Sequence, residues 1–231
     1  MLLLAVDTSG RQGGITLARG SASEFQIIES SGIQGGTFSA ELIPQITGLL
    51  ARHKLSAQGL DGLVAVSGPG SFTGLRVGLA AIKGLAEALN VPIATVSALE
   101  LLAFSTASDH TEQPPSAVSV PILALIDGGR NEVYAGIYEQ RGNEVHKRDE
   151  LLLSLSEAQD LGIRGEFRAI TSDQAIAAKF SHCEILAYPG SQSAAKLGLQ
   201  KLLAGDTVDV LALDANYIRK SEAEYLRKMQ R

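Results

Sequence analysis

The sequence predicts an α/β protein of two lobes, each built from a mixed sheet covered by helices, with a cleft between the lobes. A run of strands followed by alternating helices and strands occurs twice along the 231 residues, which implies two such units. Both units open with an apolar strand that ends in Asp and is followed by small residues and Arg, at 4–11 and 124–130. A polar, proline-containing stretch separates the units. We therefore expect an N-terminal lobe over 1–107, a linker over 108–120 and a C-terminal lobe over 121–231.

The first unit has the hydrophobic periodicity of three strands followed by alternating helices and strands. Apolar residues alternate or run continuously over strand-sized segments, and recur every three to four residues over the longer segments. Ser97, with Glu100 three residues later, forms a capping box that marks the start of the last helix. The expected elements are strands near 2–7, 14–19 and 24–29, a helix near 39–53, a strand at 63–67, a helix at 74–89, a strand at 92–96 and a helix at 98–107.

The second unit repeats this plan after the linker. Ser156, with Gln159 three residues later, has the pattern that opens a helix. The expected elements are strands near 121–127, 132–139 and 144–149, a helix from Ser156, a strand near 167–171, and helices near 173–180 and 192–204 that flank an apolar segment at 184–187.

Composition excludes several classes of protein. No apolar run reaches the 18 or more residues of a membrane span, and Cys183 is the only cysteine, so no disulfide forms within the chain. The formal charge of −5 argues against a free-standing nucleic-acid binder, because Lys and Arg supply most of the affinity for phosphates. We expect a cytoplasmic protein that makes no membrane contact and meets RNA only through a partner.

The most informative segment is 67–78, a glycine-rich turn between an apolar strand and a small-residue helix. It lacks the Gly-Lys-Ser/Thr ending of a Walker A loop and the Gly-x-Gly-x-x-Gly spacing of a dinucleotide turn. Three glycines inside the helix, Gly74, Gly78 and Gly84, each cost about 0.5 to 1 kcal/mol relative to Ala. Two explanations remain open: close packing of the helix on its own sheet, or close approach of a helix from another subunit.

The helix near 39–53 carries one apolar stripe, which most often packs into a core. Together with the small-residue face of the helix at 74–89, this stripe would form a two-helix surface that pairs with an equivalent surface on another subunit. The candidate interface residues are Leu42, Ile46, Leu49, Gly74, Arg76, Gly78, Ala81 and Leu85.

Two aspartates end the first strands of the two units. Asp7, with Thr8 and Ser9, and Asp127 would face each other across a nucleotide-binding cleft. The alternative, which we favour, is that each Asp accepts hydrogen bonds from its own turn, because Asx turns are common and need no ligand. The four histidines lack the spacing of a metal site, and Ser71 lacks the frame of a hydrolase nucleophile elbow. We therefore predict no metal ligands and no catalytic residues.

Four segments, at 4–9, 67–78, 92–99 and 127–134, resemble the YeaZ (TsaB) family of bacterial tRNA threonylcarbamoyladenosine biosynthesis proteins. The resemblance covers nearly the full length and implies the actin-like, Hsp70-like ATPase (ASKHA) fold. It also implies a non-catalytic subunit that binds and activates a TsaD-like subunit, which holds the metal and modifies the adenosine beside the anticodon of ANN-decoding tRNAs. A TsaE-like ATPase joins the complex, ATP and metal belong to these partners, and the chain alone forms a homodimer.

The chain departs from this family in places. The segment at 36–42 corresponds to the metal-binding His-x-x-x-His of the catalytic homologue but contains no histidine, and Phe38 stands where relatives have one. The second unit lacks a Gly-Gly-x-x-x-Asn adenosine element, which puts nucleotide hydrolysis in doubt. A different function stays open, that of a free-standing actin-like ATPase or small-molecule kinase using Asp7 and Asp127.

Overall fold

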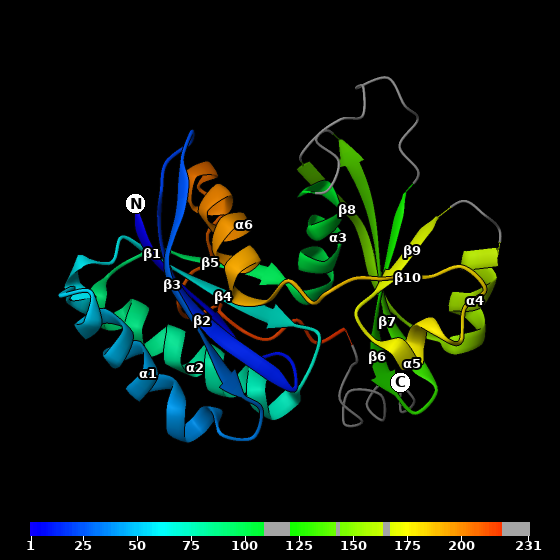
Figure 1. Cartoon of the computed structure of the whole chain (residues 1–231), viewed down its shortest axis with the longest axis horizontal. Helices are drawn as coiled ribbons and strands as arrows, with labels where there is room; N and C mark the ends of the chain where they lie inside the picture. The colour runs from blue at the N-terminus through cyan, green and yellow to red at the C-terminus, as the bar shows by residue number, and fades with distance from the viewer. Residues whose placement is uncertain (109–120, 142–143, 164–166, 219–231) are drawn as a thin grey trace, which may run out of the picture.

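A computed structural model describes residues 1–108, 121–141, 144–163 and 167–218, which form two lobes side by side (Figure 1). Each lobe contains a five-stranded mixed sheet, in the order β3-β2-β1-β4-β5 in one and β10-β9-β6-β7-β8 in the other. Taken in reverse, as β8-β7-β6-β9-β10, the second sheet arranges its strands in the same sequence order as the first. The predicted two-lobed architecture of helix-covered mixed sheets is confirmed. Most of the expected linker lies outside the described residues.

The N-terminal sheet is centred on two strands that are buried on both faces. Every residue of β1 (Leu2–Asp7) and β4 (Gly62–Gly68) is buried, and the two strands pair in parallel. Near-continuous apolar sequence is typical of such strands. The remaining strands are β2 (Gln12–Gly20), β3 (Phe25–Gln34) and β5 (Ile93–Ser97).

Two long helices cover the outer face of this sheet (Figure 1). They are α1 (Phe38–Arg52) and α2 (Phe72–Leu89), and a short 3-10 helix, η1 (Ala57–Gly59), follows α1. The Ser71 hydroxyl accepts a hydrogen bond from the Gly74 amide at 3.3 Å, so Ser71 is the N-cap of α2. Asn90 ends α2 in the left-handed conformation, with φ of 54°.

The C-terminal sheet has its own outer cover. Its strands are β6 (Ile122–Gly129), β7 (Glu132–Arg141), β8 (Glu144–Ser154), β9 (Arg168–Thr171) and β10 (Glu184–Ile185), and its outer helices are α4 (Leu155–Ile163) and α5 (Gln174–Ala177). The capping box of α4 is formed by Ser154 and Glu157, whose carboxylate accepts the Ser154 amide at 2.8 Å. The predicted start at Ser156 was therefore two residues late.

Two further helices fill the space between the sheets. The helix α3 (Ala98–Ser108) packs against the C-terminal sheet through Leu99 and Leu102 and against the N-terminal sheet through Leu101. The last helix, α6 (Gly190–Ala204), returns to the N-terminal lobe and covers the inner face of its sheet (Figure 1).

The predicted C-terminal lobe over 121–231 was therefore wrong in its last part. Residues 190–215 belong structurally to the N-terminal lobe: the Val208 amide bonds the Ile93 carbonyl at 2.8 Å, and Leu213 and Ala215 lie in the core of that lobe. The physical reason is that β1 and β4 are apolar on both faces, so the inner face also requires a cover.

Replacing Gly198 with Ala is expected to destabilise the fold by about 1 to 3 kcal/mol, because the added Cβ would overlap the Val64 side chain and push α6 from the sheet. Gly84→Ala is the matched control: its Cβ enters open space, so higher helix propensity should stabilise the fold by about 0.5 to 1 kcal/mol. Urea denaturation measures both changes, and equal stabilities for wild type and Gly198→Ala would contradict this account of α6.

Candidate functional site

A cleft of about 1100 Å³ lies between the lobes. The carboxyl ends of β1 and β4, which are parallel, reach it from one lobe, and those of β6 and β9 reach it from the other. Among the side chains that line it are Asp7, Asp127, Asp173, Tyr188 and Arg11. The ends of parallel strands are the usual place for ligands in α/β proteins, and Asp7 and Asp127 both line this cleft.

The carboxyl group of Asp7 is fully buried. Its Oδ1 accepts hydrogen bonds from the Ser9 amide at 2.9 Å and from the Ser9 hydroxyl at 2.7 Å, which is the Asx-turn geometry favoured from the sequence. Its Oδ2 has no hydrogen-bond partner among the described residues. Burial raises the pKa of Asp7, although the bonds from Ser9 oppose this shift.

Tyr188 is a member of this site that the sequence did not reveal. Its hydroxyl lies 3.1 Å from the Ser9 hydroxyl. Because Ser9 has one hydroxyl proton and donates it to Asp7, Tyr188 must donate to Ser9. Burial, followed by the charge of Asp7, raises the pKa of Tyr188 well above its ordinary value. The chain of hydrogen bonds ties the segment entering α6 to the end of β1, 179 residues away in sequence.

The other acidic groups of the cleft also bond to their own backbone. Asp127 is exposed, and its Oδ1 accepts from the Gly129 amide at 2.9 Å. Asp173 caps α5 by accepting from the Ala175 amide at 2.7 Å. Over the described ranges, no group of three or more His, Cys, Asp or Glu side chains is arranged to hold a metal ion. Thr8 does not line the cleft, since its buried side chain lies against α2.

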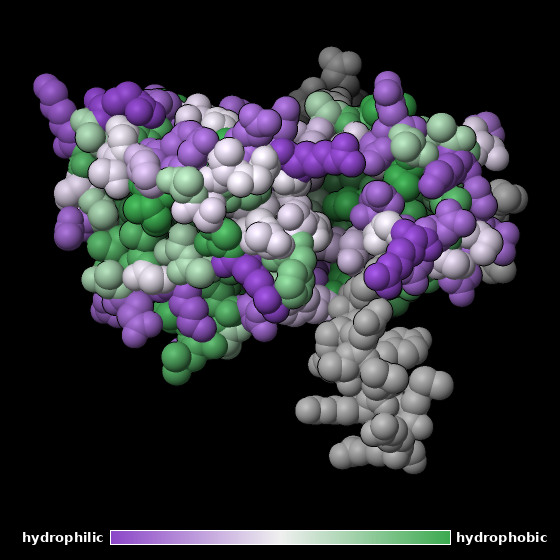
Figure 2. All heavy atoms as spheres, turned by 90° about the horizontal axis from the view of Figure 1, so that it is seen from below, coloured by the Kyte–Doolittle hydropathy of each residue, from purple (hydrophilic) through white to green (hydrophobic). Residues whose placement is uncertain are grey.

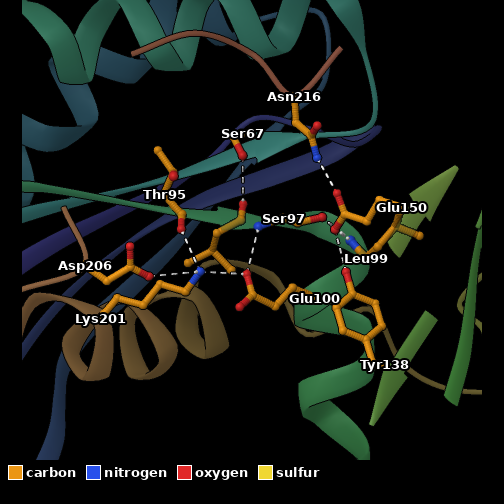
Figure 3. Close-up of polar contacts among 11 residues, drawn as sticks. Ser67, Thr95, Ser97, Leu99, Glu100, Tyr138, Glu150, Lys201, Asp206 and Asn216 are labelled. Atoms are coloured by element: carbon orange, nitrogen blue, oxygen red, sulfur yellow. Dashed lines mark hydrogen bonds and ion pairs between the residues drawn. The ribbon is translucent and has the colours of Figure 1, made fainter. Parts of the chain in front are cut away.

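A second polar cluster joins the lobes beside the C-terminal segment (Figure 3). The Asn216 side chain donates to Glu150 Oε2 at 2.6 Å, while Tyr138 donates to Glu150 Oε1 at 2.5 Å. Since the Asn216 amide also bonds Ser67 of β4, this one residue connects both sheets. Burial and the adjacent Glu150 carboxylate raise the pKa of Tyr138 above its ordinary range.

The same region contains an ion pair between helices (Figure 3). Lys201 of α6 lies 2.9 Å from Glu100 of α3 and also donates to the Thr95 carbonyl at 3.2 Å. Glu100 accepts the Ser97 amide at 3.3 Å, so the predicted capping box is confirmed. One carboxylate therefore both caps α3 and anchors α6.

The predicted interface residues are mostly inside the N-terminal lobe. Five of them are buried: Leu42, Ile46, Leu49, Gly74 and Gly78. Ala81 and Leu85 are half-buried, and Arg76 is exposed. The apolar stripe of α1 packs on the sheet, which was the alternative left open for it. The prediction that these buried side chains form a partner surface is therefore wrong for this fold.

Two of the helix glycines are explained by internal packing. A Cβ on Gly74 would overlap the Thr8 carbonyl, and a Cβ on Gly78 would overlap the Thr8 hydroxyl. These glycines let α2 approach the end of β1 closely. Gly84 is different, since a Cβ added there would enter open space, with no neighbouring element within 4 Å.

The outward face of α1 and α2 consists of residues that the sequence did not single out as a group. Phe72 is 55% exposed and Ile43 is 50% exposed, and the exposed small residues of α2 are Ala80, Gly84 and Ala88. We call these five residues the outer face. Figure 2, seen from this side, shows apolar side chains exposed on the N-terminal lobe among charged ones. The four-residue spacing of Ala80, Gly84 and Ala88 was the signal in the sequence.

Within the described part of the chain, no helix has the length and apolar character needed to span a membrane. Residues 219–231, which carry five Lys and Arg side chains and two Glu, lie outside that part.

Residues 34–213 match the family model described as TsaD: tRNA N6-adenosine threonylcarbamoyltransferase. The tRNA threonylcarbamoyladenosine biosynthesis protein TsaB of Bacillus subtilis (strain 168) is 33% identical over 141 residues, 61% of this chain and 56% of the relative. TsaB of Haemophilus influenzae is 31% identical over 135 residues, 58% of this chain and 52% of the relative. The chain thus spans about half the length of the curated relatives it matches.

A solved structure of YeaZ from Pseudomonas aeruginosa has the same fold. Its TM-score is 0.73 at 22% identity, over 93% of this chain and 100% of that one. A second structure from that organism, described as an uncharacterized protein with similarity to peptidase YEAZ, also has a TM-score of 0.73, at 21% identity over 94% and 99% of the two chains.

Replacing Asp7 with Asn is expected to stabilise the fold increasingly as the pH rises. Burial raises the pKa of Asp7 above its ordinary 3.8, so the folded chain keeps a proton that the unfolded chain releases. In wild type, the contribution of Asp7 to the free energy of unfolding is greatest below its ordinary pKa. Between the ordinary and the raised pKa, this contribution falls by about 1.4 kcal/mol for each unit of pH. Asn keeps the oxygen that accepts from Ser9 and does not titrate.

Urea denaturation at a series of pH values, from about pH 4 upward, measures this difference. The free energy of unfolding of Asp7→Asn minus that of wild type should increase with pH across the window. Asp127→Asn is the matched control, because Asp127 is exposed and should show no comparable increase. A pH-independent difference for Asp7→Asn would contradict the burial argument.

Proposed function

The chain belongs to the TsaB/YeaZ family of tRNA threonylcarbamoyladenosine biosynthesis proteins, and on that premise we propose that it is a non-catalytic subunit that binds and activates a TsaD-like threonylcarbamoyltransferase. The match to the TsaD family model over residues 34–213 supports this proposal, because a subunit of the catalytic homologue's own fold can pair with it through equivalent helices. The TsaD-like subunit would carry the chemistry on the adenosine beside the tRNA anticodon.

The outer face is the observation that carries the proposal. Phe72 of α2 and Ile43 of α1 expose large apolar side chains, and Ala80, Gly84 and Ala88 are exposed small residues of α2. Small residues let two helices approach closely, and exposed large apolar side chains favour association when they gather on one surface. Gly84 supports this interpretation, since it weakens the helix without any internal packing that requires it.

The interlobe cleft supports the assignment of chemistry to the partner. Both candidate nucleotide-binding aspartates accept hydrogen bonds from their own turns. Among the described residues that line the cleft, Arg11 is the only cationic side chain, against three aspartates. Repulsion between these carboxylates and a polyphosphate would oppose its binding. In our proposal, ATP and metal are held by the TsaD-like and TsaE-like partners.

The acidic charge of the chain is consistent with contact to tRNA only within the complex. A formal charge of −5 repels a polyanion, and phosphate contacts require Lys and Arg. The partner subunits would supply that basic surface.

A free-standing ATPase or small-molecule kinase is the second candidate, favoured by the size of the cleft, about 1100 Å³. ATP turnover by the purified chain with magnesium separates the two functions. We expect no turnover that depends on Asp7, so wild type and Asp7→Asn should give the same background. A robust rate in wild type that Asp7→Asn abolishes would favour the ATPase.

Placing a charge on the outer face is expected to block binding to the TsaD-like subunit while leaving the fold intact. In the free chain, Gly84→Glu places a carboxylate in open space. In the complex, a helix of the TsaD-like subunit would pack on Gly84 and bury that carboxylate. Burying an unpaired charge costs more than about 1.4 kcal/mol, so affinity should fall at least about tenfold.

Sedimentation velocity of the chain mixed with its cognate TsaD-like subunit measures this loss. Ala22→Glu is the control of equal charge, since Ala22 is exposed between β2 and β3, and it should bind as wild type does. Circular dichroism checks that Gly84→Glu remains folded. Wild-type affinity in Gly84→Glu would exclude the outer face as the docking surface.

A further inference from the structure

Asp7, which lines the interlobe cleft, has one carboxyl oxygen without a hydrogen-bond partner. Its Oδ1 accepts both bonds from Ser9, whereas Oδ2 has no partner among the described residues, although Asp7 is fully buried. Buried polar atoms in native proteins are almost always paired, and an unpaired buried charge is costlier still. The described part of the chain thus supplies donors to one oxygen of Asp7 and leaves the other for a ligand.

The opposite wall of the cleft carries two neighbouring carboxyl groups. Leu125 of β6 pairs with Thr171 of β9 in parallel register, and Asp127 and Asp173 each follow two residues later. Both line the cleft; Asp127 is exposed and Asp173 is half-buried. Like charges at adjacent strand ends repel each other, and a cation bound beside them offsets this repulsion. This wall therefore attracts positive charge.

The cleft as a whole suits an organic cation. Among the described residues that line it, Arg11 is the only cationic side chain, against three aspartates from the two lobes. The described residues contain no group of three His, Cys, Asp or Glu side chains placed to hold a metal ion. An ammonium group needs no such ligand set, because it brings three hydrogen-bond donors of its own to carboxylate and hydroxyl oxygens.

The size and middle of the cleft suit a ligand with two such groups. The volume of about 1100 Å³ is far larger than one ammonium group requires. Ala98, at the start of α3 between the two sheets, and Ile126 also line the cleft. These apolar side chains can contact methylene groups, which gain free energy when they leave water. A flexible aliphatic chain with an ammonium group at each end matches this order of polar, apolar and polar surface.

We propose that the interlobe cleft binds a linear aliphatic diamine, with one ammonium group at Asp7 Oδ2 and the other at Asp127 and Asp173. Because Asp7 is fully buried, the first ammonium group reaches it by displacing the Tyr188 hydroxyl, which lies 3.1 Å from the Ser9 hydroxyl. The bound ligand would join the two lobes. The inference goes beyond the proposed function, which places partner binding on the outer face and assigns no ligand to the cleft.

Binding of this ligand is coupled to release of a proton. Burial raises the pKa of Asp7, so below the raised pKa the free chain keeps the carboxyl proton. An adjacent ammonium group favours the ionised carboxylate, so binding between the ordinary and the raised pKa should release the proton to the solvent. The other titratable groups that line the cleft are Arg11, Asp127, Asp173 and Tyr188, and Asp7→Asn separates the proton of Asp7 from theirs.

Isothermal titration calorimetry of the full chain with 1,4-diaminobutane, in two buffers of different ionisation enthalpy, measures both the affinity and the proton release. The matched ligands 1-aminobutane and 1,4-butanediol have the same carbon chain with one ammonium group and with none. The diamine should bind at least about tenfold more tightly than either, because only the diamine can pair with both walls. Equal affinities for the three ligands, or no measurable binding of the diamine, would overturn the inference.

Substitutions in the chain identify the carboxyl groups involved. Asp7→Asn should weaken diamine binding at least about tenfold and abolish the proton release, and the double variant Asp127→Asn, Asp173→Asn should weaken binding as much. Asp149→Asn is the control, because Asp149 is exposed on β8 and also accepts a backbone amide, and it should bind as wild type does. Circular dichroism checks each fold. Unchanged diamine affinity in folded Asp7→Asn, or its loss in Asp149→Asn, would refute the site.

Discussion

The fold depends on a sheet whose two central strands must be covered on both faces. In β1 and β4 every residue is buried, so neither face of the N-terminal sheet can be left in water. The helices α1 and α2 cover one face, and α6, near the end of the described chain, covers the other. The Val64 side chain packs directly against Gly198 and leaves no room for a methyl group there. Gly198 therefore lets α6 lie close to β4.

This requirement explains why the two lobes are interlocked. The chain must cross from the C-terminal lobe back to the N-terminal one, and the crossing segment places Tyr188 against Ser9 and Asp7. The segment after α6 bonds Ile93 of β5 through Val208 and then Ser67 of β4 through Asn216, which also bonds Glu150 of the other lobe. Polar groups buried at such crossings require partners, and the hydrogen bonds that satisfy them also bind the lobes together.

The same packing separates the two kinds of surface in this protein. Inside the cleft, the carboxylates at the strand ends accept hydrogen bonds from their own turns, and Oδ2 of Asp7 is the one buried side-chain polar atom without a hydrogen-bond partner among the described residues. Outside, α2 turns Gly74 and Gly78 toward Thr8, and this orientation leaves Ala80, Gly84 and Ala88 exposed. The need to pack against β1 therefore decides which residues α2 can offer to another subunit.

The sequence by itself determined the secondary structure and the duplicated plan, because hydrophobic periodicity and capping at Ser97 are local properties of the chain. It also predicted that Asp7 and Asp127 lie at the ends of equivalent strands, and it favoured the hydrogen bonds from their own turns that the structure shows. Only the tertiary structure decided where α6 packs, which face of α2 is outward, and that Tyr188 and Asn216 join distant segments. A helix with apolar and small residues on several sides has more than one face that could be buried, and the choice is made by the sheet against which it packs.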